Sequence, residues 1–231
     1  AVKETFTVEK ILTEKDFEEE WKNASCRAVP LGGSADGEKV CWDISSNVKH
    51  LIVSENAEEE KKADRLLEYI CRICPHTQVW RGDMSQEEAE KIGEKINLLY
   101  SDILRLSEEG VRAKQEGKPL PDFSHKIIVI RHYDALMRQL PAEQNQTLRG
   151  ILSAISSGYH IHFVFMNQRE EMDSYYNEEI WKLPEENGIW LGESKKAAEI
   201  FSCPIEDCGA EMNIFCREGK GIAFRLPERR E

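Results

Sequence analysis

Residues Asn47 to Cys74 read NVKHLIVSENAEEEKKADRLLEYICRIC, and this stretch indicates the fold class. A short apolar run, Leu51 to Val53, leads into a turn, and a helical pattern follows from Asn56. The apolar residues of that pattern recur at the period of an amphipathic helix. The stretch therefore predicts a buried strand that passes through a tight turn into a helix packed on a sheet. The first turn of the helix is crowded with acids.

Composition and charge narrow the classes of function. The chain has 231 residues, of which 40% are apolar, enough for the core of one large α/β domain. We predict a single domain over 1–231, with a lead-in helix and hairpin in 1–46, the α/β core in 47–226 and a tail in 227–231. The net charge of -12 would repel a phosphate backbone, so nucleic acid is not an expected partner. The sequence has neither a membrane-spanning apolar run nor a signal peptide, which predicts a soluble, intracellular chain without direct membrane insertion.

Short apolar runs alternate with helical periodicity along most of the chain. Ser85 and Glu88 form a capping box that starts one helix, and another helix begins near Pro141 and is expected to end at Gly158. Strands separated by crossover helices predict an α/β fold with a mainly parallel β-sheet flanked by helices on both faces. The expected strands are Lys39–Ile44, His50–Val53, Thr77–Arg81, Lys126–Ile130, Ile161–Met166, Gly188–Leu191 and Gly221–Leu226, and the expected long polar loops are Gly110–His125 and Asn167–Gly188.

The seven cysteines favour free thiols, because an odd number in a large domain suits a reducing compartment better than a disulfide framework. Cys71 and Cys74 form a CxxC pattern, but both fall on the apolar stripe of the helix that follows Asn56. We interpret them as core residues. A metal site is left open at three other cysteines, whose spacing matches no common zinc module. These are Cys203, Cys208 and Cys216.

The opening stretch resembles the phosphate-binding loop of FtsK/SpoIIIE-type motor ATPases, with which it aligns without a gap. In that family, the loop consists of glycine, four residues, glycine, lysine and then serine or threonine, and the glycine amides and lysine hold phosphates. The matching residues here are Glu55, Glu60, Lys61 and Lys62. Only the lysine is kept.

Other landmarks of the family follow in the same order. The strand that ends in two carboxylates in those ATPases ends here in Arg131 and His132, and the resembled sensor strand closes on Gln168 and Arg169. The lead-in VPLGGS and the closing GKGIAF are also similar, so the resemblance covers about residues 27 to 226. It points most directly to the last, degenerate ATPase-like module of the EssC/EccC motors of type VII secretion, and it implies a RecA/FtsK-like P-loop NTPase fold.

The substitutions predict a module without catalytic residues, nucleotide or metal. A carboxylate about 5 Å from one phosphate charge costs about 3 kcal/mol at an effective dielectric near 20, whereas micromolar binding is worth about 8 kcal/mol. Arg131 has the wrong charge to hold magnesium. His132 is expected to be a hydrogen-bonded structural residue. Gln168 is the one sensor-type residue left, and without phosphate it has nothing to sense. At the turn, Asn56 is expected to cap the helix and Glu59 to complete a capping box.

The resemblance implies a non-catalytic module of a membrane-anchored secretion motor at the cytoplasmic face of the bacterial membrane. Its partners would be neighbouring ATPase modules and small helical secreted substrates. Tyr175, Tyr176 and Trp181 are the candidate docking residues, since aromatic side chains contribute large contact areas at interfaces. Trp190, inside an apolar strand, is expected in the core.

One alternative stays open. Lys61, Lys62 and Arg131 would together bind phosphate without a glycine loop, and the chain would then be a weak, unorthodox ATPase that drives protein export. A DNA translocase is disfavoured by the net charge and by a shortened segment between TQVWRGD and KIIVI.

Overall fold

The structure is a computed structural model of the chain, and it forms two compact units. It describes residues 11–23, 25–119, 123–177, 188–202 and 212–229. The first unit comprises 1–43, 53–75 and 185–231, and the second comprises 44–52 and 76–184. Strand β3 (Lys49–Ser54) contributes its first residues to the second unit and its last residues to the first.

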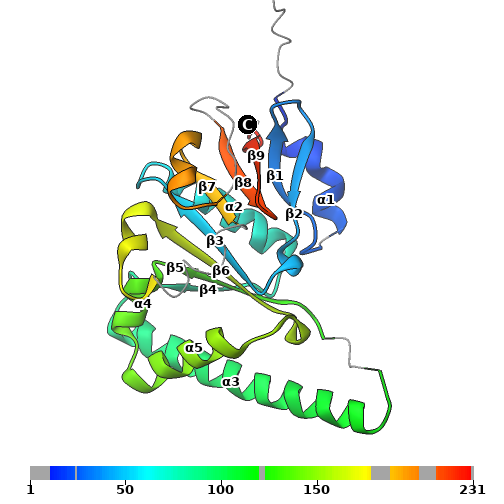
Figure 1. Cartoon of the computed structure of the whole chain (residues 1–231), viewed down its shortest axis with the longest axis vertical. Helices are drawn as coiled ribbons and strands as arrows, with labels where there is room; N and C mark the ends of the chain where they lie inside the picture. The colour runs from blue at the N-terminus through cyan, green and yellow to red at the C-terminus, as the bar shows by residue number, and fades with distance from the viewer. Residues whose placement is uncertain (1–10, 24, 120–122, 178–187, 203–211, 230–231) are drawn as a thin grey trace, which may run out of the picture. The chain divides into compact units, whose positions relative to one another are not determined.

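The first unit is an antiparallel sheet with one long helix on it. Its elements are η1 (Glu14–Phe17), α1 (Glu18–Asn23), β1 (Val29–Ser34), β2 (Lys39–Trp42), α2 (Glu60–Ile73), β7 (Gly188–Leu191), η5 (Ser194–Glu199), β8 (Asn213–Arg217) and β9 (Lys220–Arg225). The strand order is β2-β1-β9-β8-β7, and α2 packs against β1 and β7 (Figure 1). Beyond the end of β3, the Glu55 N–H donates to the Leu191 carbonyl at 2.8 Å.

The second unit is a parallel sheet flanked by helices. Its elements are η2 (Ile44–Ser46), β4 (Gln78–Arg81), α3 (Gln86–Gln115), β5 (Lys126–Arg131), α4 (Tyr133–Gln139), α5 (Ala142–Ala154), η3 (Ser157–Tyr159), β6 (Ile161–Gln168) and η4 (Arg169–Asp173). Strands β4, β5 and β6 run parallel, and Arg81, Arg131 and Met166 are in register at their carboxyl ends. The start of β3 joins β6, because Phe163 N–H donates to the Val48 carbonyl at 2.7 Å. In Figure 1, α5 lies alongside α3.

The parallel strands and their crossover helices confirm the predicted α/β class. Strands of parallel sheets are covered on both faces and are therefore continuously apolar. In β5 every residue after Lys126 is buried, and in β6 every residue before Gln168 is buried. The capping box of α3 is also confirmed, since Glu88 N–H donates to Ser85 Oγ at 3.3 Å and Ser85 N–H donates to Glu88 Oε2 at 2.9 Å. Trp190 is fully buried, as expected.

Several predicted boundaries were wrong. Strand β2 ends at Trp42 rather than at Ile44. Helix α3 continues to Gln115, so the expected loop from Gly110 begins later. Gly117 follows the C-cap residue Glu116, and its φ of +66° suits a residue without a side chain. Helix α5 ends at Ala154 rather than at Gly158. The expected loop from Asn167 starts inside β6 and then forms η4.

The two cysteines at the end of α2 are not core residues. The buried stripe of this helix is Ala63, Leu66, Leu67, Tyr69, Ile70 and Ile73. Cys71 is exposed, because it lies a third of a turn away from the centre of that stripe at 100° per residue. Cys74 follows the last helical residue and is half-buried. Strand β8 and helix α4 were not predicted.

Among the described residues, none of the helices has both the length and the apolar composition that crossing a membrane requires.

Candidate functional site

Glu55, at the first glycine position of the resembled loop, folds its side chain onto the turn after β7. Glu55 Oε2 accepts a hydrogen bond from the Glu193 N–H at 2.7 Å, and Glu55 Oε1 pairs with Lys196 Nζ. Glu55 is half-buried, with 16% of its side chain exposed. A backbone amide and an ammonium are also the groups with which proteins bind phosphate oxygens. In this corner, they bind a carboxylate of the chain itself.

Gly192 makes this arrangement sterically feasible. Its φ of +143° is in a region that side chains rarely adopt, and a Cβ atom there would lie 2.5 Å from both Cβ and Oε2 of Glu55. Glu55 therefore packs directly on the glycine backbone. Gly192, Glu193 and Lys196 were not singled out from the sequence, since they are remote along the chain from Glu55.

The acidic turn before α2 is organised by Asn56. Asn56 Oδ1 accepts hydrogen bonds from the N–H groups of Glu58 and Glu59, at 2.9 and 3.1 Å. The predicted capping box does not form, because the helix begins later, at Glu60, with Glu59 as its N-cap residue. The Glu59 carboxylate pairs with Lys62 instead.

The two lysines of the resembled loop have different environments. Lys62 pairs with Glu59 and reaches Asn213 Oδ1 at 3.4 Å. Lys61 is exposed and, among the described residues, makes no ion pair. Glu60 is half-buried at the start of α2. Of the two lysines, Lys61 is therefore the one that makes no ion pair with a described residue.

Arg131 and His132 lie at the carboxyl end of β5, in the second unit. Arg131 is 8% exposed, and its carbonyl accepts a hydrogen bond from Gly82 N–H at 2.9 Å. His132 has a φ of +52° and precedes the first turn of α4. His132 Nδ1 donates to Glu171 Oε1 at 2.8 Å, which commits the imidazole to a structural contact.

Gln168 ends β6 and is the N-cap residue of η4, and Glu171 closes a capping box on it. Glu171 Oε2 accepts the Gln168 N–H at 2.7 Å while its other oxygen holds His132. Glu171 therefore ties the ends of β5 and β6 together. This carboxylate was missed, since the acidic loop offers several glutamates and no local pattern distinguishes one of them.

The candidate site residues are divided between the two units. Glu55, Glu60, Lys61 and Lys62 belong to the first, where Glu55 and Lys62 pair with residues of that unit. Arg131, His132 and Gln168 belong to the second, where Glu171 binds two of the three. In the first unit, the Glu55 carboxylate joins the end of β3 to the turn after β7. In the second unit, the Glu171 carboxylate joins the ends of β5 and β6.

The described docking residues are Tyr175 and Tyr176. Tyr175 is 64% exposed, and its ring lies 5.2 Å from that of Tyr176 in an edge-to-face contact. Tyr176 is half-buried, with its hydroxyl 3.4 Å from Asn145 Nδ2. Trp181 lies outside the described residues. Tyr175 therefore supplies the most accessible aromatic surface of this pair.

Of the three cysteines at which a metal site was left open, the structure describes one. Cys216 is buried in β8, while Cys203 and Cys208 lie outside the described residues. The described part of the chain contains no group of three or more His, Cys, Asp or Glu residues arranged to hold a metal.

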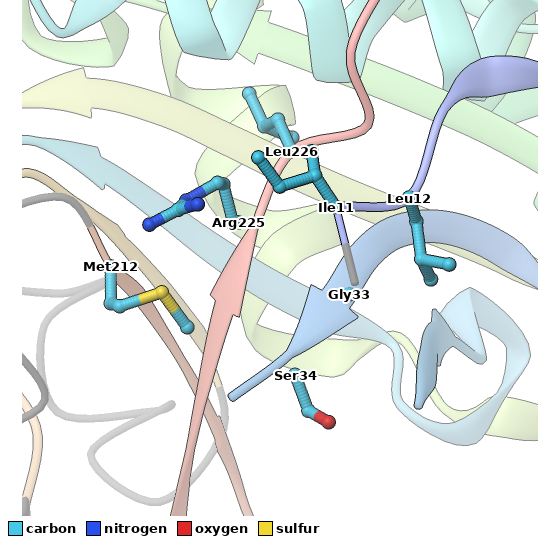
Figure 2. Close-up of a pocket in the computed structure, with 7 residues that line it drawn as sticks. All are labelled: Ile11, Leu12, Gly33, Ser34, Met212, Arg225 and Leu226. Atoms are coloured by element: carbon cyan, nitrogen blue, oxygen red, sulfur yellow. The ribbon is translucent and has the colours of Figure 1, made fainter. Parts of the chain in front are cut away.

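Two pockets formed by described residues lie away from the predicted site residues. Figure 2 shows a pocket in the first unit between Leu12, Gly33, Met212 and Leu226, with a volume of about 20 Å³. This volume holds about one water molecule. In the second unit, an open pocket of about 300 Å³ lies between β4 and α3, with Val79, Met84 and Ile92 among its lining residues.

Lowering the pH should weaken the contacts of Glu55 with Lys196 and Glu193, and a substitution at Glu55 tests this effect. Partial burial alone would raise the pKa of Glu55, but hydrogen bonds from Lys196 and Glu193 hold it below its ordinary value of 4.5. Ionised Glu55 thus stabilises the fold above about pH 4.5 and loses this effect as the pH falls through the folded pKa. We expect Glu55→Gln to flatten the decline in unfolding free energy below pH 4.5, measured by urea unfolding. The exposed carboxylate variant Glu90→Gln should keep the wild-type decline, and an unchanged slope in Glu55→Gln would contradict the prediction.

Comparisons with known proteins bear on the fold. No protein-family model matches the chain, and no curated protein matches it by sequence. Solved structures do match: the cytoplasmic domain of EssC is 11% identical with a TM-score of 0.73, and EssC ATPases 2 and 3 from Geobacillus thermodenitrificans are 12% identical with a TM-score of 0.70. Thermomonospora curvata EccC ATPases 2 and 3, in complex with a signal sequence peptide, are 12% identical with a TM-score of 0.61.

The three matches cover 96% of this chain but only 48%, 45% and 44% of the solved chains. This chain therefore spans less than half of each. At such low identity, the likeness shows the fold. The chain has an α/β fold similar to the folds of the cytoplasmic domain of EssC and of EccC ATPases 2 and 3.

Proposed function

We propose that this chain is a non-catalytic, ATPase-like module of a type VII secretion motor. It would act by recognising the exported protein, docking on a neighbouring module or regulating it. The observation that carries the proposal is the Glu55 carboxylate, which takes up the Glu193 N–H and the Lys196 ammonium at the first glycine position of the resembled phosphate loop. A nucleotide phosphate would have to displace a carboxylate that is held by a charge-assisted hydrogen bond.

The remaining charges of the corner support the same conclusion. Lys62 is paired with Glu59, which leaves Lys61 as the exposed cation among four glutamates. At the position of the metal-binding carboxylate, the second unit has Arg131, a cation with no oxygen to offer magnesium. The alternative, a weak ATPase that binds phosphate through Lys61, Lys62 and Arg131, has to break the Lys62 pair first.

The proposed partners follow from the matched proteins. Two of the matched structures contain ATPases 2 and 3 of one chain, and one of them was solved with a signal sequence peptide. We infer that a neighbouring ATPase module and a small helical export substrate are the partners here, and that the module works at the cytoplasmic side of a membrane-anchored motor. Tyr175, Tyr176 and Trp181 form the proposed docking surface.

Calorimetric titration with magnesium-ATP tests the absence of nucleotide binding. We expect no binding as tight as 10 μM, which corresponds to about 7 kcal/mol. The matched variant Glu55→Gly with Glu60→Gly restores the spacing of glycine, four residues, glycine and lysine, and it should bind more tightly than the wild type, because it removes two acids and frees Lys196. A wild-type dissociation constant of 10 μM or less would favour the ATPase alternative.

A further inference from the structure

Strand β4 forms the outer edge of the parallel sheet of the second unit. It pairs with β5 on one side, and among the described residues no strand pairs with it on the other. The Gly82 N–H donates to the Arg131 carbonyl at 2.9 Å, and in a parallel pair the backbone groups of alternate residues point to the same neighbour. Those of Trp80 therefore also face β5, whereas the N–H and C=O groups of Val79 and Arg81 point away from it. Such an edge offers hydrogen bonds to an added strand.

The side chains of the same two residues lie on one face of the sheet. Side chains alternate along a strand, so Val79 and Arg81 point to one face while Gln78 and Trp80 point to the other. The second direction is confirmed by the Trp80 indole, whose Nε1 donates to Gln78 Oε1 at 3.2 Å. Val79 and Arg81 line the open pocket of about 300 Å³, together with Ile92 of α3. A strand added to β4 would thus place every second side chain at this pocket.

The pocket combines an apolar wall with cations that have no ion pair. Val79 and Met84 are half-buried, and Ile92 is 7% exposed. Arg81 and Lys95 also line the pocket; both are exposed, and neither makes an ion pair with a described residue. An added strand would therefore find an apolar contact next to Val79 and, two positions along the same face, a partner for a carboxylate.

The other charged groups of the pocket are engaged, with one exception. Lys91 Nζ pairs with Glu87 Oε1 at 2.7 Å, and Glu88 closes the capping box on Ser85. Asp83 is exposed and makes no ion pair with a described residue. Two unpaired cations are thus opposed by one unpaired acid, in a chain whose net charge is -12. This local excess of positive charge favours an acidic side chain on the partner.

We propose that β4 is a docking edge for an extended segment of a partner protein, which adds to the sheet as a further strand and carries an apolar and an acidic residue two positions apart. The apolar side chain contacts Val79 in the pocket, and the carboxylate binds Arg81 and Lys95. Main-chain hydrogen bonds supply affinity in this mode, and the pocket for alternate side chains supplies specificity. Arginine binds a carboxylate through two parallel hydrogen bonds, which fixes the register of the added strand.

A second copy of the chain fits this edge less well. It would bring another Arg81 to an edge that already has unpaired cations, and two chains with a net charge of -12 repel each other. The partner is therefore a different protein. The inference goes beyond the proposed secretion function and does not depend on it.

Fluorescence anisotropy with labelled peptides and the whole chain tests the proposal. The two probes are short threonine-rich peptides in which a valine and a glutamate stand two positions apart, in either order, so that both strand directions are covered. We expect one of them to bind with a dissociation constant below about 1 mM. A control peptide with valine and glutamate adjacent should bind about tenfold more weakly, because its two side chains face opposite sides of the strand.

Substitutions in the chain identify the groups that bind the probe. Arg81→Gln should weaken binding about tenfold, because the charge-assisted hydrogen bonds to the carboxylate are lost. Asp83→Asn should strengthen binding, since it removes the opposing charge. The matched control is Lys114→Gln, which removes a positive charge from the exposed surface of α3 outside the pocket and should leave the affinity unchanged.

Hydrogen exchange measured by NMR distinguishes an added strand from a ligand that only fills the pocket. The Val79 and Arg81 amides should become protected when the probe binds, whereas the Trp80 amide, which faces β5, should be protected with and without it. Binding that leaves the first two amides unprotected would overturn the proposal. The same holds if neither probe binds below about 1 mM, if Arg81→Gln binds as the wild type does, or if a dimer of the chain alone protects these amides.

Discussion

Replacing Asn167 by leucine is expected to lower the free energy of unfolding by about 3 kcal/mol. The Asn167 side chain is 3% exposed; its Oδ1 accepts the Tyr133 N–H at 3.1 Å, and its Nδ2 donates to Asn177 Oδ1 at 3.2 Å. Leucine has a similar shape but neither polar atom. The first turn of α4 then loses an acceptor, and the buried Asn177 loses a donor, each at a cost of about 1–3 kcal/mol.

Urea unfolding followed by circular dichroism measures this effect. The matched control is Asn97→Leu on the exposed surface of α3, which should stay within about 0.5 kcal/mol of the wild type. A loss in Asn167→Leu no larger than that of the control would mean that the end of β6 does not depend on this side chain. The contacts of Glu171 with His132 and Gln168 would then suffice to order it.

Asn167 illustrates what the sequence could not reveal. The apolar run from Ile161 to Met166 predicted a buried strand correctly, but the polar residues after it had the composition of a loop. Asn167 is nevertheless buried, because Tyr133 and Asn177 satisfy its amide. Those partners lie on other elements, so no local pattern indicates them.

The same limit applies to the candidate site. The alignment of the turn at Glu55 was derived from residues next to each other in the sequence. The partners of Glu55 come from the turn after β7, through a contact that needs the unusual backbone of Gly192. The alignment placed Glu55 at the first glycine position of the resembled loop. The structure adds the Glu193 N–H and the Lys196 ammonium, which bind its carboxylate.

Strand β8 was missed for a different reason. Its apolar residues are only Ile214, Phe215 and Cys216, between Asn213 and Arg217. A run this short does not establish a strand by periodicity. Its antiparallel pairing with β7 and β9 supplies the backbone hydrogen bonds that stabilise it. Longer runs such as Lys126 to Ile130 were recognised because both faces of those strands are buried.

Changing Tyr175, Tyr176 and Trp181 together to alanine should abolish export by the intact motor. Tyr175 is 64% exposed, and its ring lies next to that of Tyr176. Interface anchors of this type are worth about 2 kcal/mol or more each. Binding of a substrate helix or a neighbouring module at micromolar to millimolar affinity amounts to about 4 to 8 kcal/mol. Losing two or three anchors would therefore reduce such binding below a useful level.

The control variant changes a second exposed apolar surface, on α3. There, Tyr100 is 47% exposed and Leu104 is 48% exposed. Tyr100→Ala with Leu104→Ala should leave export at the normal rate. Folding of the triple variant is checked by its melting temperature, because Tyr176 also contacts Asn145; Tyr175→Ala alone avoids that contact and should reduce export without a change in stability. If the folded triple variant exports at the normal rate while the α3 variant does not, the docking surface lies on α3, and the aromatic pair only packs against its own unit.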